Sequence, residues 1–257
     1  MLHNIFSYIG RRTLYFAEEV GIYVTLFRKT VLSFARIPKE LHNIFLQMEE
    51  IGFNSMPVVL ITGMFTGMVL ALQTYAGFAR FNATSFVGPV VALSMCRELG
   101  PVLTAFVVSG RAGSAMAAEL GTMRVTEQID ALYTLSTDPV DFLILPRFLS
   151  GIVMLPVLTI ISDLIGILGG FYVAVNLFGE NSVMYMDTTF KYLLMGDVLK
   201  GLAKAFVFGG IIAIVSCKEG FFTSGGAEGV GKATTKSVVI SYMAILISDY
   251  FLTSLMF

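Results

Sequence analysis

The chain has 257 residues, of which 56% are hydrophobic and only 14% charged, and its formal net charge is −1. Soluble domains carry about 25% charged residues, so this composition excludes an ordinary soluble domain and predicts a protein embedded in the lipid bilayer. The near-neutral charge argues against a nucleic-acid partner, because phosphate binding needs an excess of basic residues. The two cysteines and two histidines show no metal-ligand spacing, so we expect no metal site.

The N-terminal residues 1–50 repeat apolar side chains at helical spacing, with polar residues between them. The apolar run at residues 20–27 is too short to cross a membrane, since a crossing takes about 20 residues. We therefore expect interfacial amphipathic helices in this region. A soluble helical hairpin is the alternative.

Residues 51–257 predict an all-α membrane protein domain with five transmembrane helices. The expected spans are about 51–79, 86–118, 148–178, 198–217 and 237–257. The second segment is longer than the hydrocarbon core requires, so it must tilt, bend or protrude, and Gly88-Pro89 and Gly100-Pro101 are the expected bends. The polar stretch 119–147 is expected outside the bilayer, and 179–197 and 218–236 are expected to be loops.

The distribution of basic residues predicts the orientation. Eleven lysines and arginines fall in the segments on the side of the N-terminus, and three fall in the opposite loops. Because cytoplasmic segments carry the excess of basic residues, we expect a cytoplasmic N-terminus and a C-terminus on the outer side.

Small residues recur three or four apart along the first two spans, which gives two smooth helix faces. The positions are Gly63, Gly67, Gly110, Gly113, Ala117 and Gly121. We expect them to pack against neighbouring helices. Arg111 and Glu119 flank the second face, where snorkelling or a salt bridge at the helix end is their expected role.

An adjacent Arg97–Glu98 pair interrupts the second apolar segment. A charge within the bilayer costs about 3 kcal/mol on translocon scales, so the pair needs a partner, a water-filled cavity or a ligand. Arg97 offers a planar fork of donors to a lipid phosphate, and Glu98 can neutralise it when no lipid is bound. The alternative is an inert ion pair between two subunits. For Asp163 and Asp249, also within spans, a structural role is expected and a proton relay is the alternative.

A short polar amphipathic stretch follows the second span. Ile129 and Leu132 share one face of it, while Glu127, Gln128 and Asp130 point elsewhere. Such a helix either connects two spans along the membrane surface or serves as a docking knob for a cytoplasmic partner.

The run RELGPVLTAFVVSGRAGSAMAAELGTMRVTEQIDAL (97–132), with the Asp138-Pro139 and Pro146-Arg147 pairs after it, closely resembles the MlaE/YrbE permease family. The similarity extends from GMVLALQ (67–73) through KATTKSVV (232–239) to the end of the chain. The resemblance implies a homodimer of five-span subunits in the bacterial inner membrane, which moves phospholipid between the inner and outer membranes as part of an ABC transporter.

The resemblance also implies partners. A separate ABC ATPase subunit would bind a coupling helix at about residues 122–135 and would carry the ATP and Mg, so no cofactor is expected in this chain. An MCE-domain periplasmic protein would sit on the outer side, and a STAS-domain protein can accompany the ATPase. The implied coupling residues are Thr122, Arg124, Thr126, Glu127, Gln128, Ile129, Asp130 and Leu132. The implied lipid pocket lies at the dimer interface, at Leu70, Gly77, Phe78, Phe81, Arg97 and Glu98.

Three other interpretations are weaker. Residues 226–233 nearly match a phosphate-binding loop, but Ala233 replaces the required hydroxyl and no strand precedes it, so a flexible loop is expected. An ion-coupled secondary transporter or channel without an ATPase predicts internal repeats, and none is found. An intramembrane enzyme needs a nucleophile–base pair or metal ligands, and the histidines, His3 and His42, are confined to the N-terminal region. We therefore expect a transport subunit and not an enzyme.

Overall fold

The computed structural model describes the backbone of residues 2–256 and the side chains of residues 10–15, 17–34 and 40–256, so the side chain of His3 lies outside the described residues. Within residues 2–256 all regular structure is helical, with no strand. Five helical segments are long and apolar enough to span a membrane: Glu40–Phe81, Thr84–Val125, Val140–Leu177, Met195–Phe221 and Gly226–Met256. The predicted all-α fold with five spans is therefore confirmed.

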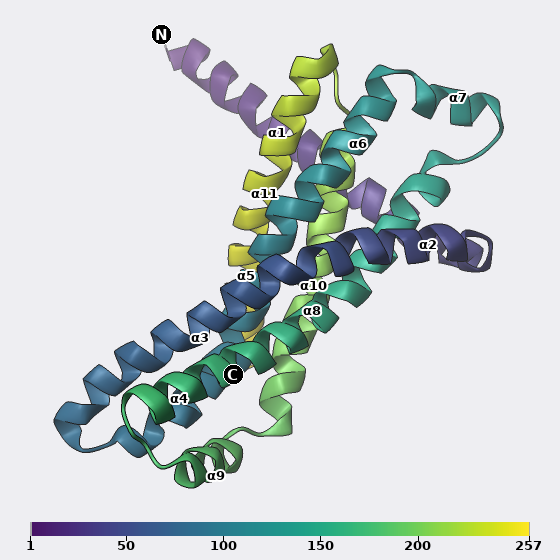
Figure 1. The fold of residues 1–257 in the computed structure, drawn as a ribbon. Coiled ribbons are helices and arrows are strands. Elements are labelled where there is room, and N and C mark those ends of the chain that lie inside the picture. Colours follow the sequence, from purple (N-terminus) through teal and green to yellow (C-terminus); the bar gives the residue numbers. More distant parts are fainter. Residues whose placement is uncertain (1, 257) are drawn as a thin grey trace.

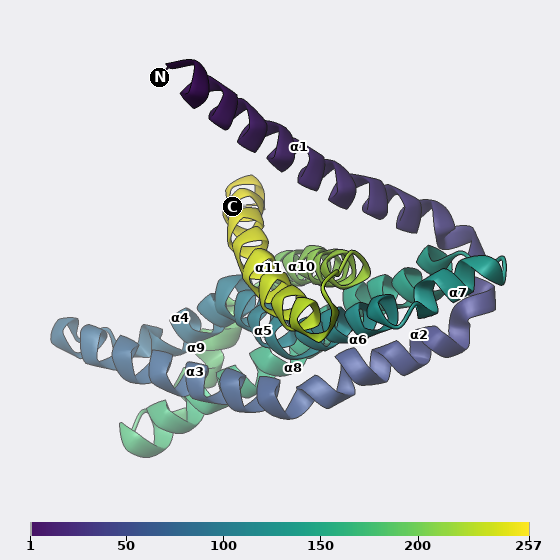
Figure 2. The same ribbon diagram turned by 90° about the horizontal axis from the view of Figure 1, so that it is seen from above.

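The N-terminal region is helical and continues directly into the first span. Its elements are α1 (Leu2–Leu32), η1 (Ser33–Arg36), α2 (Ile37–Ile51) and η2 (Phe53–Ser55), followed by α3 (Met56–Phe78). The apolar stretch of the first span already begins at Glu40 within α2, and α2 and α3 follow one another with a bend between them (Figure 1 and Figure 2).

The second span is a chain of helical pieces, reached from α3 through the short turns η3 (Ala79–Phe81) and η4 (Thr84–Phe86). Its parts are α4 (Val87–Ser94), the π-helical turn η5 (Met95–Leu99), α5 (Gly100–Val108), the π-helical turn η6 (Ser109–Gly113) and α6 (Ser114–Val125). Pro101 lacks a backbone N–H and crowds the turn before it, which accounts for η5 and for the irregularity expected at Gly100-Pro101. Pro89 lies in the first turn of α4 instead, where proline is tolerated.

The remaining elements are α7 (Gln128–Thr134), η7 (Val140–Ile144), α8 (Leu145–Tyr172), η8 (Val173–Leu177), α9 (Ser182–Tyr192), α10 (Met195–Phe221) and α11 (Gly226–Met256). The stretch 179–197, expected as a loop, contains α9. Asn181 caps this helix, since its side-chain oxygen accepts hydrogen bonds from the backbone N–H groups of Val183 and Met184. Seen from above, α1 runs past α10 and α11 on one side, and α2 and α3 lie on the other (Figure 2).

The expected loop at 218–236 is also wrong. α10 continues to Phe221 and α11 begins at Gly226, which leaves a turn of four residues. Gly225 adopts a φ of +92° in that turn, a backbone conformation that favours glycine. The stretch that nearly matches a phosphate-binding loop is thus the start of a membrane helix.

Small residues bring the spans into close contact. A Cβ added at Gly67 in α3 would lie 1.9 Å from the carbonyl oxygen of Gly166 in α8, and one at Gly63 would lie 2.7 Å from the hydroxyl of Ser162. The small faces of α3 and α8 therefore fit each other with the two backbones almost touching. Between α5, α8, α10 and α11, a core of fully buried side chains includes Ala105, Leu155, Phe208 and Ile245.

Charged residues are buried at the two ends of α10. Asp197 lies in its first turn and Lys218 in its last, and both are buried. They are twenty-one positions apart along the helix, which is about 31 Å. This length matches the roughly 30 Å hydrocarbon core of a bilayer, so each buried charge lies near one membrane surface.

Candidate functional site

The site begins with the irregular backbone of η5. Because Pro101 has no N–H, it cannot donate to the carbonyl of Arg97, four residues earlier. The ammonium of Lys204 in α10 donates to this carbonyl at 3.1 Å. A Cβ added at Gly201 would lie 1.9 Å from the carbonyl oxygen of Cys96, so only a glycine there allows α10 to approach η5 this closely.

Arg97 and Glu98 each form an ion pair with a different helix. Arg97 bonds to Oδ1 of Asp197 through Nη2 at 2.7 Å and Nε at 2.9 Å. Glu98 pairs with Lys204 at 2.7 Å, and Lys204 also pairs with Asp249 of α11 at 3.0 Å. The Arg97 guanidinium thus faces a carboxylate one hundred residues later in the chain, a partner that the local sequence does not indicate.

We call Arg97, Glu98, Asp197, Lys204 and Asp249 the ion network. The side chain of Lys204 is 0% exposed and that of Asp197 is 6% exposed, whereas those of Arg97 and Glu98 are 38% and 37% exposed. The Thr253 hydroxyl lies 2.7 Å from the Lys204 ammonium and 3.0 Å from Glu98 Oε1. Buried anchors on α10 and α11 therefore hold two half-exposed charges of the second span in place.

The two acids that sequence left open have different surroundings. Asp249 belongs to the ion network. Asp163 of α8 is buried, and its Oδ1 has no hydrogen-bond partner among the described residues. A Cβ added at Gly100 would lie 1.7 Å from that oxygen, so Asp163 faces the backbone of the second span beside η5.

The apolar residues of the implied lipid pocket come from the end of the first span. Leu70 and Phe78 of α3 pack against a core cluster that contains Met95 and, at its edge, Leu99, so this cluster borders both ends of η5. Phe81 is 78% exposed, and Gly77 has open space at its Cβ position. Within one subunit, Leu70 and Phe78 thus pack on the apolar cluster that borders η5, while Gly77 and Phe81 have open surroundings.

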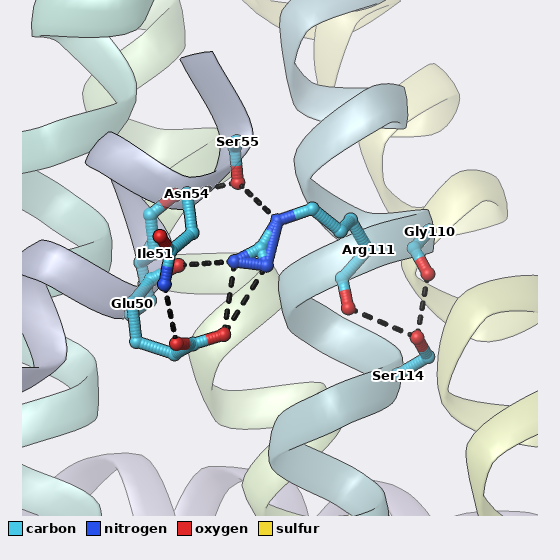
Figure 3. A network of polar contacts seen from close by, with 7 residues as sticks. All are labelled: Glu50, Ile51, Asn54, Ser55, Gly110, Arg111 and Ser114. Atoms are coloured by element: carbon cyan, nitrogen blue, oxygen red, sulfur yellow. Dashed lines mark hydrogen bonds and ion pairs between the residues drawn. The ribbon is translucent and has the colours of Figure 1, made fainter. Parts of the chain in front are cut away.

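Arg111, in η6, clamps the second span to the start of the first (Figure 3). Its Nη2 donates to the carbonyl oxygen of Glu50 at 2.5 Å and to Glu50 Oε1 at 2.9 Å. Its Nε donates to the Ser55 hydroxyl at 3.0 Å. Glu119, the other flanking charge, pairs with Arg147 of α8 at 2.6 Å. Of the two roles expected for these residues, the structure shows the salt bridge.

The remaining small positions of the second span also face helices or the turn between them. Added Cβ atoms would lie 3.2 Å from the Tyr242 hydroxyl at Gly110, 2.9 Å from the Ser216 hydroxyl at Gly113, and 3.2 Å from the Thr223 hydroxyl at Gly121. Ala117 is fully buried. The second small face therefore packs on α10, α11 and the turn between them.

The polar connector after the second span is shorter than expected. The implied coupling helix at 122–135 is divided: Thr122 and Arg124 still belong to α6, and a separate helix α7 covers Gln128–Thr134. Glu127 adopts a φ of +59° at the break, where right-handed helix cannot continue.

The two faces of α7 differ as the spacing predicted. Ile129 is fully buried, and Leu132 packs at the edge of the same cluster, which also holds Leu26 of α1 and Cys217 of α10. The polar residues around Ile129 are exposed: Gln128 and Asp130 on α7, Thr126 and Glu127 just before it, and Thr122 on α6. Arg124, also on α6, pairs with Asp130 at 2.6 Å. Because Leu26, Ile129 and Cys217 meet in one cluster, α1, α7 and the C-terminal end of α10 lie on the same side of the spans.

Comparison with known proteins identifies the family. A family model described as Permease MlaE matches residues 44–255. The chain belongs to the MlaE permease family. A Rickettsia conorii protein named "Probable ABC transporter permease protein" is 51% identical over 257 residues, which cover 100% of this chain and 99% of the relative.

More distant relatives of this MlaE-family permease come from photosynthetic organisms. A Synechocystis protein with the same description is 48% identical over 211 residues, covering 82% of this chain and 80% of the relative. The chloroplastic Arabidopsis thaliana protein Trigalactosyldiacylglycerol 1 is 41% identical over 215 residues, which cover 84% of this chain and 61% of the relative. The chain is therefore a multi-pass membrane permease, as the sequence predicted.

Sequence reasoning found Arg97 and Glu98 in this permease but missed two of their anchors. Asp197 ends the stretch 179–197 that the sequence predicts as a loop, and Lys204 lies in an apolar segment that contains no acidic residue. The available signal was Lys204 itself, because a lysine in an apolar segment needs a partner. Nothing in the local sequence names that partner, since Glu98 and Lys204 are brought together only by the close contact of α10 with η5.

Proposed function

We propose that this chain is the permease subunit of an ABC transporter that moves phospholipid between the inner and outer membranes of a bacterium. Membership of the MlaE permease family and about 50% identity to proteins named ABC transporter permeases support a transport subunit. The name of the Arabidopsis relative includes a diacylglycerol lipid, which favours a lipid as cargo.

The observation that carries the lipid substrate is the half-exposed Arg97–Glu98 pair beside an apolar cluster. Arg97 keeps 38% of its side chain exposed although Asp197 fixes it. A guanidinium fork held in this way suits a phosphate, and the cluster that receives Leu70 and Phe78 suits acyl chains. A second copy of the chain would complete the pocket, since Gly77 and Phe81 face outward and are open to cover by a partner subunit.

A separate ATPase is the proposed energy source, and it would carry the ATP and Mg. The exposed side of α7 supports this role, because charged residues alternate there with exposed apolar ones. Val125, Tyr133 and Leu135 are 40%, 55% and 73% exposed next to Glu127 and Asp130. Because Ile129 anchors α7 in a buried cluster, α7 can transmit movement of an ATPase to the second and third spans.

The positive-inside bias favours a cytoplasmic location for α1, α7 and the α10–α11 turn of the proposed inner-membrane protein. The shared cluster of Leu26, Ile129 and Cys217 supports one common side for these elements. The C-terminus and α9 then face the outer side, where an MCE-domain protein would receive or supply lipid. A STAS-domain protein can accompany the ATPase.

Lipid transfer by the purified complex tests the proposal. Arg97→Ala should abolish most transfer of a fluorescent phospholipid to acceptor vesicles while the permease still binds its ATPase. Arg80→Ala is the matched control, since Arg80 is exposed in η3. Wild-type transfer by the Arg97→Ala complex would contradict the assigned lipid contact.

Co-purification tests the coupling surface separately. The double substitution Glu127→Lys and Asp130→Lys should release the ATPase, because it reverses two exposed charges on α7. Asp187→Lys on α9 is the control, since Asp187 is also exposed but α9 lies at the opposite end of the spans from α7 (Figure 1). Unchanged ATPase binding by the α7 variant would show that the docking surface lies elsewhere.

A further inference from the structure

A large apolar groove lies between α1, α8, α10 and α11, where α1 passes the last two spans (Figure 2). Its volume is about 880 Å³, within the roughly 300–1,000 Å³ typical of ligand pockets. Aromatic and aliphatic side chains form its walls, among them Phe27, Phe148, Phe206, Ile211 and Met243. None of the residues assigned to the proposed dimer-interface pocket lines it.

One end of the groove is ionic. Glu19 of α1 and Lys236 of α11 line it, and they meet two buried residues at the end of α10. Lys218 donates to Glu19 and, at 2.9 Å, to Glu219. Lys236 lies 3.0 Å from Glu219 and 3.8 Å from Glu19. Tyr23 donates to Glu219 at 2.5 Å. Two ammonium groups and two carboxylates thus balance each other.

The length of the groove matches one leaflet. Along α11 its lining runs from Lys236 to Ser248, a distance of about 18 Å for twelve helical residues. Half of the hydrocarbon core is about 15 Å. The ionic end lies where α10 ends, near one membrane surface, so the apolar part extends to about the middle of the bilayer.

We infer that this groove is a binding site for one zwitterionic phospholipid from the leaflet on the α1 side. Its acyl chains lie along the apolar walls, its phosphate meets Lys236, whose side chain is 48% exposed, and its ammonium meets Glu19. The balanced charges favour a zwitterionic headgroup over an anionic one. A spanning helix of a partner would need contact over about 30 Å, so the groove is too short for it.

This inference needs only the placement of the chain in a membrane and does not depend on the proposed transport function. The test uses the full chain, purified in detergent and washed free of loosely bound lipid. The probe is phosphatidylethanolamine with a photoactivatable group on an acyl chain, and labelled peptides are mapped by mass spectrometry. We expect labelling of α10 and α11 at the groove walls, in competition with unlabelled phosphatidylethanolamine.

Two substitutions on α11 provide matched variants. Ala244→Phe fills the groove and should reduce the label about tenfold. This decrease corresponds to a loss of about 1.4 kcal/mol of binding free energy. Leu246→Phe lies on another face of the same helix, exposed and outside the groove, and should leave the label unchanged. Thermal unfolding of both variants shows whether α11 still packs.

A third variant keeps the inference testable if Ala244→Phe does not fold. Lys236→Gln keeps the groove open but removes the phosphate contact, and it should lower labelling about tenfold. Equal labelling of the wild type and Lys236→Gln, equal displacement by phosphatidylglycerol, or label confined to other spans would overturn the assignment. So would recovery of a partner helix crosslinked in the groove without lipid.

Discussion

The ammonium of Lys204 lies 2.7 Å from Glu98 and 3.0 Å from Asp249, so one fully buried cation serves carboxylates from two other spans. It also donates to the Arg97 carbonyl, whose usual donor is missing at Pro101. A single lysine therefore connects the second, fourth and fifth spans and compensates for the irregular turn that presents Arg97 and Glu98.

Removal of this cation should destabilise the protein strongly. Lys204→Met leaves the carboxylates of Glu98 and Asp249 without the cation between them. Loss of one partner of a buried pair costs about 3–5 kcal/mol, and the partial exposure of Glu98 puts the expected loss at the lower end of that range. Thermal unfolding of the purified chain in detergent measures the loss. Lys191→Met, at an exposed position on α9, is the control and should unfold like the wild type. An unchanged midpoint for Lys204→Met would disprove the anchoring role.

Contact between α3 and α8 should depend on the absence of one side chain. Gly67→Ala places a Cβ 1.9 Å from the carbonyl oxygen of Gly166, and the required backbone shift should cost about 1–3 kcal/mol. Gly77→Ala on the same helix has open space and should leave stability unchanged or raise it slightly, because alanine is the better helix former. Denaturant or thermal unfolding measures the stability of both variants. Equal stability of Gly67→Ala and Gly77→Ala would refute the close contact between α3 and α8.

The Arg111 clamp should set the mobility of the α2–α3 junction. Arg111→Met removes the bonds to Glu50 and Ser55, so hydrogen exchange of the backbone amides around residues 50–56 should accelerate. The expected loss is about 1–2 kcal/mol, less than for a buried pair because Glu50 is about half exposed. Ser114→Ala is the control: among the described residues, its hydroxyl donates to the carbonyls of Gly110 and Arg111 in the same span (Figure 3). Exchange that accelerates equally in both variants would argue against the clamp.

Attachment of α1 should weaken in acid. The hydrogen bond from Lys218 holds the pKa of Glu19 below its ordinary value of 4.5, with Lys236 also lowering the pKa and the nearby Glu219 raising it. Because the pKa of Glu19 is lower in the folded state than in the unfolded state, the ionised Glu19 carboxylate stabilises the fold above pH 4.5. This stabilisation is lost as the pH falls through the folded-state pKa of Glu19. Burial and Glu219 raise the pKa of Tyr23, so its hydroxyl stays a donor at neutral pH.

Hydrogen exchange of α1 amides at neutral pH and below pH 4 measures this effect. The wild type should lose protection in acid. Glu19→Gln should be less protected at neutral pH and show a smaller further loss. Identical pH profiles for the two proteins would exclude Glu19 as the titrating group.

The five spans could be predicted from sequence because long apolar segments are read directly from composition. Arg97 and Glu98 could be selected because charges in such a segment are expensive. The anchors could not be assigned: the pairing of Arg97 with Asp197 is set by the kink at Pro101 and the close approach at Gly201, which are properties of two helices together.

The loop predicted at residues 218–236 is wrong because most of its glycines lie within helices. The stretch from Gly226 to Gly231 has weak intrinsic helix propensity, yet it forms the first turns of α11, where Glu228 and Lys232 form an i,i+4 ion pair at 2.6 Å. At α7 the opposite error arose. The polar stretch suggested one continuous helix, and the left-handed conformation of Glu127 divides it.

The two buried charges at the ends of α10 also act as a ruler for the surrounding lipid. Asp197 and Lys218 are about 31 Å apart along the helix, and neither tolerates a hydrocarbon environment without its partners. In a thicker bilayer, α10 cannot simply stand more upright to compensate, so annular lipids must thin around the protein or its subunits must cluster. The thickness of a membrane therefore determines whether this fold can be accommodated in it without a mismatch cost.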